Sequence, residues 1–204
     1  MSTAGGSLSL RLQEHPADEA PYITAARDGD REARAWLVQR FTPPVYRFAL
    51  RLLGDEQDAR DAAQDTMVKV LRSLDRYDER WRFSTWVFGI ARNTCIDEHR
   101  RRRRGGEAVD DEVVDARPGP HELSSRAERA RLLHDALAEV PPLYREVLIL
   151  YHFEHLKYEE IAEALEIPMG TVMNRIFRAR KKLKEALEAR GDLEGLAGVQ
   201  GGGP

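Results

Sequence analysis

The segment from residue 158 to residue 183 constrains the fold of this chain more than any other. Ile161, Ala162 and Leu165 recur at helical spacing, which gives a first short helix one apolar face. Residues 167–170 then include a proline, which cannot continue a preceding helix but fits the first turn of a new one. A second helix follows from Thr171, and its apolar stripe is Val172, Ile176, Ala179 and Leu183. Two short helices joined by a tight turn have the layout of a helix-turn-helix.

The second helix of this pair carries polar and basic residues on the face away from its apolar stripe. Short polar side chains can meet base edges in a major groove, and cations can meet phosphates. The candidates for contacts with duplex DNA are Thr171, Asn174, Arg175, Arg178, Arg180 and Lys181. A helical hairpin with a solvated basic face is the plainer alternative.

The average charge of the chain hides local clusters of cations. The formal net charge is -3, which by itself argues against a nucleic-acid partner. The cations are concentrated, however, in five consecutive arginines at 100–104 and in six basic residues at 175–184. Because local fields steer a polyanion more than net charge does, a nucleic-acid partner is compatible with this composition.

The cysteine content and the lack of long apolar runs indicate the cellular compartment of the protein. A single cysteine, Cys95, excludes an internal disulfide and favours a reducing interior. No apolar run approaches the roughly 20 residues of a membrane span, and the N-terminus has no secretion-signal pattern. We therefore expect a cytoplasmic protein that does not insert into a membrane.

Hydrophobic spacing is helical on both sides of a central acidic segment, and no alternating strand pattern competes with it. We therefore predict an all-α fold with two helical domains joined by a flexible acidic linker. The predicted divisions are a flexible arm at 1–19, a helical bundle at 20–104, the linker at 105–127, the helix-turn-helix domain at 128–190 and a glycine-rich disordered tail at 191–204. Within the bundle, Pro43 and Pro44 predict a break between two helices, and Ser84 predicts the N-cap of the last one.

Aromatic and basic residues alternate in the segment from residue 77 to residue 104. Such a surface suits single-stranded nucleic acid, because each base stacked on a ring is worth roughly 1–3 kcal/mol and cations follow the backbone. The candidates are Arg80, Trp81, Arg82, Trp86, Arg92, Asn93 and the arginine run that contains Arg100 and Arg101. For any single aromatic residue, packing in the core is an equally good explanation.

Three blocks of the sequence cover most of both predicted domains. They are DARDAAQDTMVKVLRSLDRYD at 58–78, FSTWVFGIARNTCIDEHRR at 83–101 and PPLYREVLILYHFEHLKYEEIAEALEIPMGTVMNRIFRARKKL at 141–183. In order, spacing and content they resemble RNA polymerase sigma factors of the extracytoplasmic-function (ECF) type, in the sigma-70 family. The resemblance leaves out the arm, the linker and the tail.

The resemblance implies a specificity subunit, without catalytic residues or a cofactor of its own, that binds core RNA polymerase and directs it to promoter DNA. In the family the exposed face of the third helix docks on the polymerase, and the matching positions here are Asp61, Gln64, Asp65, Lys69 and Arg72. The segment 80–101 matches the part that melts and reads the −10 element. There Asn93 and Asp97 are placed for contacts with a flipped base, and Trp81 or Trp86 for stacking on it. The helix-turn-helix matches the part that reads the −35 element as duplex.

The resemblance also implies partners and marks departures from the family. Members are often held inactive by an anti-sigma factor, so we expect one here, and we expect a monomer when the protein is free. The acidic linker matches the family's connector, although a plain solvated tether explains it equally well. Glu166 stands where a glycine is common, Met173 where a lysine is frequent and Phe177 where a histidine is often seen. If Glu166 adopts a left-handed conformation, its Cβ costs about 1 kcal/mol.

Two other classes of protein fit parts of the sequence. A free-standing helix-turn-helix regulator would usually bind two half-sites as a dimer, and the chain has no heptad stripe for dimerisation. A metalloenzyme could use His152 and His155, but no cysteine or third histidine lies nearby in the sequence to complete a site. Cys95 has no base beside it, and we expect it to pack as a small apolar residue.

Overall fold

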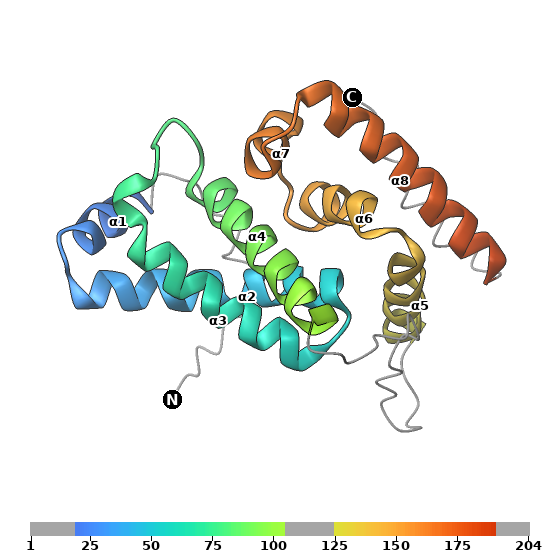
Figure 1. The fold of residues 1–204 in the computed structure, drawn as a ribbon, viewed down its shortest axis with the longest axis horizontal. Coiled ribbons are helices and arrows are strands. Elements are labelled where there is room, and N and C mark those ends of the chain that lie inside the picture. The colour runs from blue at the N-terminus through green and yellow to red at the C-terminus, as the bar shows by residue number, and fades with distance from the viewer. Residues whose placement is uncertain (1–18, 105–124, 191–204) are drawn as a thin grey trace, which may run out of the picture.

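The computed structural model describes residues 19–104 and 125–190, and its regular structure there is helical. Figure 1 shows two helical halves side by side. The N-terminal half contains α1 (Ala20–Arg27), α2 (Arg31–Leu53), α3 (Glu56–Arg72), the short 3-10 helix η3 (Leu74–Arg76) and α4 (Phe83–Arg104). The C-terminal half contains α5 (Ser125–Glu139), α6 (Pro142–Leu148), the π-helical turn η4 (Ile149–Phe153), α7 (Tyr158–Leu165) and α8 (Met169–Ala189).

The prediction of an all-α fold is confirmed for the part of the chain that the structure describes. The predicted tail lies outside the described residues, and so does nearly all of the predicted arm and linker. Helix α5 begins at Ser125, inside the range predicted for the linker.

Helix α2 continues through Pro43 and Pro44, so the predicted break between two helices is wrong. Each proline removes a backbone donor, which normally destabilises a helix interior. Phe41 and Val45, on either side of the prolines, are both buried and belong to one apolar face. Because most helical stability in proteins comes from packing of such a face, the contacts of α2 with α3 and α4 outweigh the lost hydrogen bonds. The Thr42 hydroxyl also donates a 2.7 Å hydrogen bond to a carbonyl of the preceding turn.

Helix α4 begins at Phe83, two residues before Thr85, where a helix capped by Ser84 would begin, so the predicted N-cap is wrong. The backbone N–H of Trp86 donates to the Arg82 carbonyl at 3.3 Å, so helical hydrogen bonding already starts there. Phe83 is buried, and its ring centroid lies 5.0 Å from those of Phe41 and Tyr77. Aromatic packing rather than a side-chain cap therefore fixes the start of α4.

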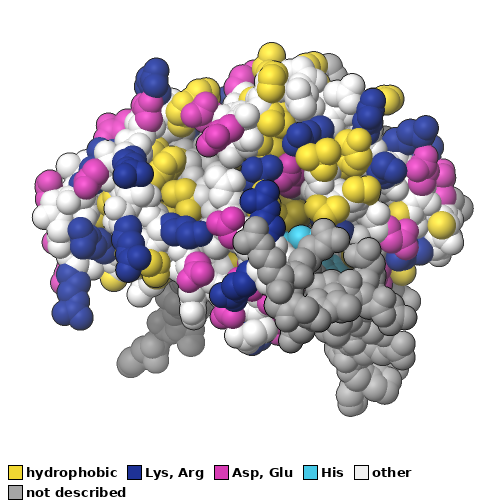
Figure 2. Space-filling model, in the orientation of Figure 1, with side chains coloured by type: hydrophobic (Ala, Val, Ile, Leu, Met, Phe, Trp, Pro, Cys, Tyr) yellow, Lys and Arg dark blue, Asp and Glu magenta, His cyan; other side chains and the backbone are white. Residues whose placement is uncertain are grey.

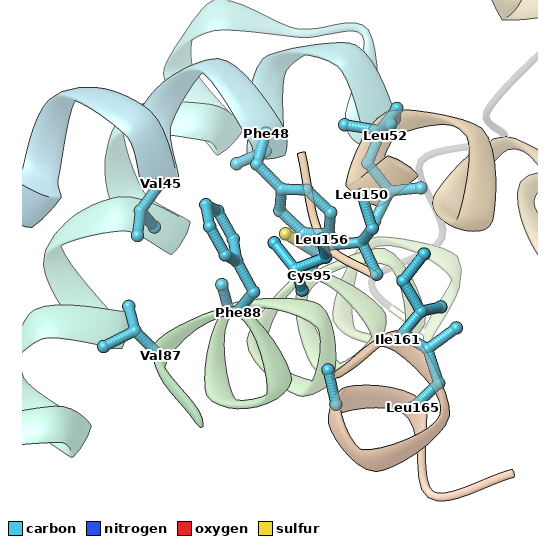
Figure 3. Close-up of a cluster of buried hydrophobic side chains, with 14 of the residues drawn as sticks. Val45, Phe48, Leu52, Val87, Phe88, Cys95, Leu150, Leu156, Ile161 and Leu165 are labelled. Carbon is cyan, nitrogen blue, oxygen red and sulfur yellow. The ribbon is translucent and has the colours of Figure 1, made fainter. Parts of the chain in front are cut away.

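The two halves pack on each other and share one hydrophobic core. Helix α4 contacts α7, and α2 contacts α5, α6 and η4. In Figure 3, Phe48 of α2 and Phe88 of α4 lie beside Leu150, Leu156 and Ile161 of the C-terminal half, and all five side chains are buried. The sequence predicted two tethered domains but gave no indication of this contact between them.

Candidate nucleic-acid interface

The turn between α7 and α8 contains a residue in the left-handed conformation, and this residue is Glu166, for which the sequence analysis considered that conformation. Glu166 has φ 53° and ψ 44°, although it is not a glycine. The conformation lets the backbone N–H of Ile167 donate to the Ala162 carbonyl at 3.0 Å, which closes the end of α7. Pro168 then precedes α8, and its carbonyl accepts the Thr171 N–H at 2.8 Å. The helix-turn-helix geometry is thus built at the cost of one strained residue.

The front of α8 gathers four of the six residues predicted to contact duplex DNA. The predicted inward stripe of the helix is buried, as its spacing indicated. On the other side a shallow hollow is lined by Thr171, Asn174, Arg175 and Arg178, together with Leu143, Tyr144 and Gly170. Asn174 and Arg178 are exposed, while Thr171 and Arg175 are half-buried. A concave polar and basic surface of this kind can follow a DNA groove.

The other two predicted duplex contacts lie apart from that hollow. Arg180 is half-buried, and its guanidinium carbon lies 5.3 Å from the centroid of the Tyr151 ring. It therefore packs against η4 instead of extending from the front of α8. Lys181 is exposed and lies 3.9 Å from Glu185, one turn further along the helix.

Three large apolar side chains on α8 are exposed, and the sequence analysis did not assign them to the interface. Met169, Met173 and Phe177 follow one another at intervals of four residues and are 47%, 50% and 72% exposed. Apolar side chains on a recognition helix can contact thymine methyl groups in the major groove. The sequence could have indicated that these three side chains are exposed, because their positions fall outside the inward apolar stripe of α8.

The two tryptophans near α4 lie in different surroundings. Trp86 is half-buried, and its ring lies 5.4 Å from that of Tyr77 and 5.6 Å from that of Phe83. Trp81 lies in the loop before α4 and lines a second shallow hollow, whose other walls are residues 159–169 of α7, the turn and the start of α8. Both tryptophans are half-buried, and Trp81 is the one that borders the turn between α7 and α8.

The basic residues at the start of this surface have carboxylate partners. Arg80 forms a hydrogen bond with Asp78, with 2.5 Å between Nη2 and Oδ2. That interaction raises the pKa of Arg80, and the charge of Glu163 on α7 adds to the increase. Arg82 lies 3.7 Å from the carboxylate of Glu160, which is also on α7.

The remaining candidates for the single strand lie along α4. Asn93 is exposed and accepts a 3.1 Å hydrogen bond from Arg92. Asp97 is exposed and lies 3.8 Å from Lys69 of α3. Arg100 and Arg101 are exposed near the end of the helix, and Arg101 donates to Glu98 at 2.8 Å.

The outer side of α3 presents the residues predicted to dock on the polymerase. Gln64, Asp65, Lys69 and Arg72 are exposed, and Asp61 is half-buried. Val68 lies among them on the same face and is 46% exposed. The sequence analysis missed Val68, although its position between Asp65 and Lys69 places it on that face.

One buried carboxylate joins the two predicted DNA surfaces. Glu146 of α6 has a side chain only 5% exposed, and it accepts hydrogen bonds from Arg92 of α4 and from Arg175 of α8, both 3.1 Å long. Burial raises the pKa of Glu146, which the hydrogen bond from Arg92 and the charges of both arginines only partly offset. Two residues predicted to contact DNA are therefore held by the protein itself.

Figure 2 shows basic side chains on both halves of the molecule and at the junction between them, with hydrophobic side chains beside them on the C-terminal half.

Cys95 is buried, which raises its thiol pKa to about 12, and it packs as a small apolar residue as expected. Within residues 19–104 and 125–190, no three histidine, cysteine or acidic side chains are grouped to hold a metal ion. In the same ranges no helix combines the length and the apolar character that crossing a membrane requires.

Comparison with known proteins gives the same two parts. Residues 37–105 match the family described as "Sigma-70 region 2", and residues 130–183 match "Sigma-70, region 4". The chain is 37% identical over 181 residues to the ECF RNA polymerase sigma factor SigE of Mycolicibacterium smegmatis, covering 84% of this chain and 70% of that protein. It is 34% identical over 177 residues to the RNA polymerase sigma-H factor of Pseudomonas aeruginosa, covering 81% of this chain and 92% of the relative.

Solved structures resemble the chain across both halves. One is CnrH in complex with the cytosolic domain of CnrY, with a TM-score of 0.64, 29% identity, and coverage of 85% of this chain and 98% of that one. Another is the sigma factor RpoE in complex with the anti-sigma factor NepR from Bartonella quintana. It has a TM-score of 0.64, 26% identity, and coverage of 76% of this chain and 96% of that one.

Proposed function

The chain belongs to the extracytoplasmic-function group of the sigma-70 family, and we propose that it binds core RNA polymerase and directs initiation at a specific set of promoters. The observation that carries the proposal is the front of α8, a polar and basic recognition surface within the region-4 match. The protein would act as a specificity subunit, and the chemistry of RNA synthesis would belong to the polymerase.

The −35 element would be read as duplex by α8. Asn174 and Arg178 are exposed at the front of the helix, where an amide can pair with adenine and a guanidinium with guanine or a phosphate. Thr171 and Arg175 border the same hollow, and Lys181 extends the cationic face toward the DNA backbone. Met173 and Phe177 add apolar contacts for thymine methyl groups. Arg180 packs over Tyr151, so its contribution would be to hold α8 in place.

The −10 element would be held as a melted strand by α4 and the loop before it. Trp81 offers a ring for stacking, and Asn93 and Asp97 offer polar groups for a base taken out of the duplex. Arg80, Arg82, Arg92, Arg100 and Arg101 supply positive charge for the backbone. Trp86 would support this surface through its packing with Tyr77 and Phe83.

The outer face of α3 would bind the polymerase. It combines acidic, basic and amide groups with the exposed apolar side chain of Val68. An apolar centre with a polar rim is the usual composition of a protein interface. A second protein partner would be an anti-sigma factor, which the complex of the similar sigma factor RpoE with the anti-sigma factor NepR supports.

The test is run-off transcription with purified core polymerase on a library of genomic promoters. We expect transcripts from a defined subset of templates that require this protein, and none from polymerase alone. Folded protein that activates no template would overturn the proposal.

Native mass spectrometry of the free protein separates this function from that of a free-standing regulator. A monomer that forms a one-to-one complex with core polymerase fits a sigma factor. A stable dimer that binds a palindromic duplex and forms no complex with the polymerase fits the regulator.

A further inference from the structure

We propose that the sugar–phosphate backbone of the −35 duplex passes closest to the protein at Gly170, the second residue of α8, and that a side chain at this position would keep α8 out of the major groove. Gly170 is then a positioning residue, which acts through the base contacts of Asn174 and Arg178. The inference rests on the proposed function, because it takes the front of α8 as the surface that reads duplex DNA.

The backbone conformation at Gly170 does not require a glycine. The backbone N–H groups of Thr171 and Val172 both donate to the Pro168 carbonyl, at 2.8 Å and 3.2 Å, so the first turn of α8 is regular. Gly170 does not have a positive φ, in contrast to Gly54, which ends α2 with φ 81°. Glycine is favoured at such a left-handed helix end, whereas any residue can adopt the conformation of a regular first turn.

The packing around Gly170 does not require a glycine either. A Cβ added at Gly89 of α4 would lie 3.1 Å from the Ala164 carbonyl oxygen, so the close approach of α7 explains that glycine. A Cβ added at Gly170 would meet no atom of the described residues within 4 Å. Because glycine loses more conformational freedom on folding than any other residue, alanine at position 170 would give the more stable free protein. The reason for this glycine therefore lies outside the described part of the chain.

The open space beside Gly170 belongs to the surface that is assigned to DNA. Gly170 lines the shallow hollow at the front of α8, next to Thr171 and Asn174 and with Leu143 and Tyr144 of α6. The charged residues that line this hollow are both arginines, Arg175 and Arg178. Guanidinium groups bind phosphate well, so the chemistry of the hollow suits a DNA strand.

A glycine lets a ligand come close to the protein main chain, and in DNA the outermost groups are the phosphates and sugars. Contacts with these groups fix the register of a protein on the duplex, while base edges supply the sequence information. Asn174 and Arg178 are exposed about one and two turns further along α8. If a strand rests on Gly170, α8 enters the groove far enough for these side chains to reach the bases. A methyl group between the strand and the helix would lift both of them away.

Gly170→Ala in the full-length protein tests the inference, because its two expected effects have opposite signs. Holoenzyme reconstituted from the variant and core polymerase should bind a promoter duplex roughly tenfold more weakly than wild-type holoenzyme, or weaker still. The thermal midpoint of the free variant should rise by about 1–4 °C. Unchanged promoter affinity would overturn the inference. A lower thermal midpoint would overturn it too, because glycine would then have a use inside the protein.

The matched control is Gly54→Ala. An added Cβ at Gly54 also meets no atom within 4 Å, but the residue has φ 81° and lies at the end of α2. We expect this variant to have a lower thermal midpoint and the promoter affinity of the wild type. A loss of affinity equal to that of Gly170→Ala would show that any added methyl group impairs binding, and would overturn a specific role for Gly170.

Promoter duplexes that each carry one uncharged methylphosphonate in the −35 element test whether the contact is to the DNA backbone. Wild-type holoenzyme should lose roughly tenfold in affinity at one or two phosphates, and Gly170→Ala should lose little at the same phosphates, because it has already lost that contact. Equal losses for the two proteins at every phosphate would overturn the inference. Failure of the proposed function would look different, because wild-type holoenzyme would then bind the unmodified promoter no better than core polymerase alone.

Discussion

The carboxylate of Glu154 lies 3.8 Å from the guanidinium of Arg51, across the junction of the two halves. Burial raises the pKa of Glu154 from 4.5 to about 7, and the charges of Arg51 and Arg47 offset only part of that effect. The folded protein therefore holds a proton on Glu154 at pH values where the unfolded chain has released it. Stability from this group is fully present below pH 4.5 and is lost as the pH rises to about 7.

The prediction concerns the difference between wild type and Glu154→Gln, because other carboxylates also titrate. Between the two pKa values the free energy of unfolding of the wild type should fall relative to that of the variant by an amount on the order of 3 kcal/mol. Urea unfolding at several pH values measures it. An exposed control, Glu185→Gln, should follow the wild type. Parallel curves for wild type and Glu154→Gln would show that Glu154 titrates normally.

Glu166→Gly should stabilise the protein. Glu166 occupies the left-handed region at φ 53°, where a Cβ is strained and glycine is not. We expect the free energy of unfolding to rise by up to about 1 kcal/mol, reduced by the greater entropy of glycine in the unfolded chain. Thermal unfolding measures the change. Glu163→Gly, in the interior of α7, should be destabilising instead.

Part of the fold could be predicted from the sequence and part could not. Periodicity predicted the buried stripe of α8, and Pro168 predicted the break at residues 167–170, although α8 begins at Met169 and not at Thr171. The break at Pro43 was wrong, because a single sequence does not reveal how strongly the neighbouring apolar face is packed. The contact between the halves was missed for a related reason. Leu150 and Leu156 are apolar whether they are covered by their own half or by α2 and α4, and periodicity cannot distinguish these cases.

Asn174→Ala should reduce affinity for the specific duplex while leaving stability unchanged. The side chain is exposed at the front of α8, so its loss removes a base contact without opening the core. We expect a cost of about 1–3 kcal/mol on the cognate duplex and little change on unrelated DNA. Fluorescence anisotropy at two salt concentrations measures both. As a comparison, Lys184→Ala should weaken binding to either duplex alike, because we assign this exposed lysine to phosphate contacts, which carry no sequence information.

The two tryptophans near α4 should respond differently to substitution. Trp86→Ala removes a half-buried ring that packs with Tyr77 and Phe83, so it should lower the free energy of unfolding by about 2 kcal/mol. Trp81→Ala should leave stability nearly unchanged and slow promoter opening, with a loss of about 1–3 kcal/mol for one stacked base. Chemical unfolding and stopped-flow detection of strand separation give the two readouts. Trp81→Phe should recover part of the opening rate, and a purely structural role for Trp81 would appear as a loss of stability instead.

Val68 is the residue of α3 that best separates docking from folding. Its side chain is 46% exposed amid polar neighbours, so the free protein gains little from it, whereas a partner that covers it would bury apolar surface. Val68→Ser should therefore weaken the complex with core polymerase by at least about 1 kcal/mol, or fivefold, without changing the free energy of unfolding appreciably. Val68→Ile keeps the apolar surface and should bind as the wild type does. Competition for core polymerase against a labelled wild-type chain measures both variants, and equal binding by Val68→Ser would move the docking surface away from α3.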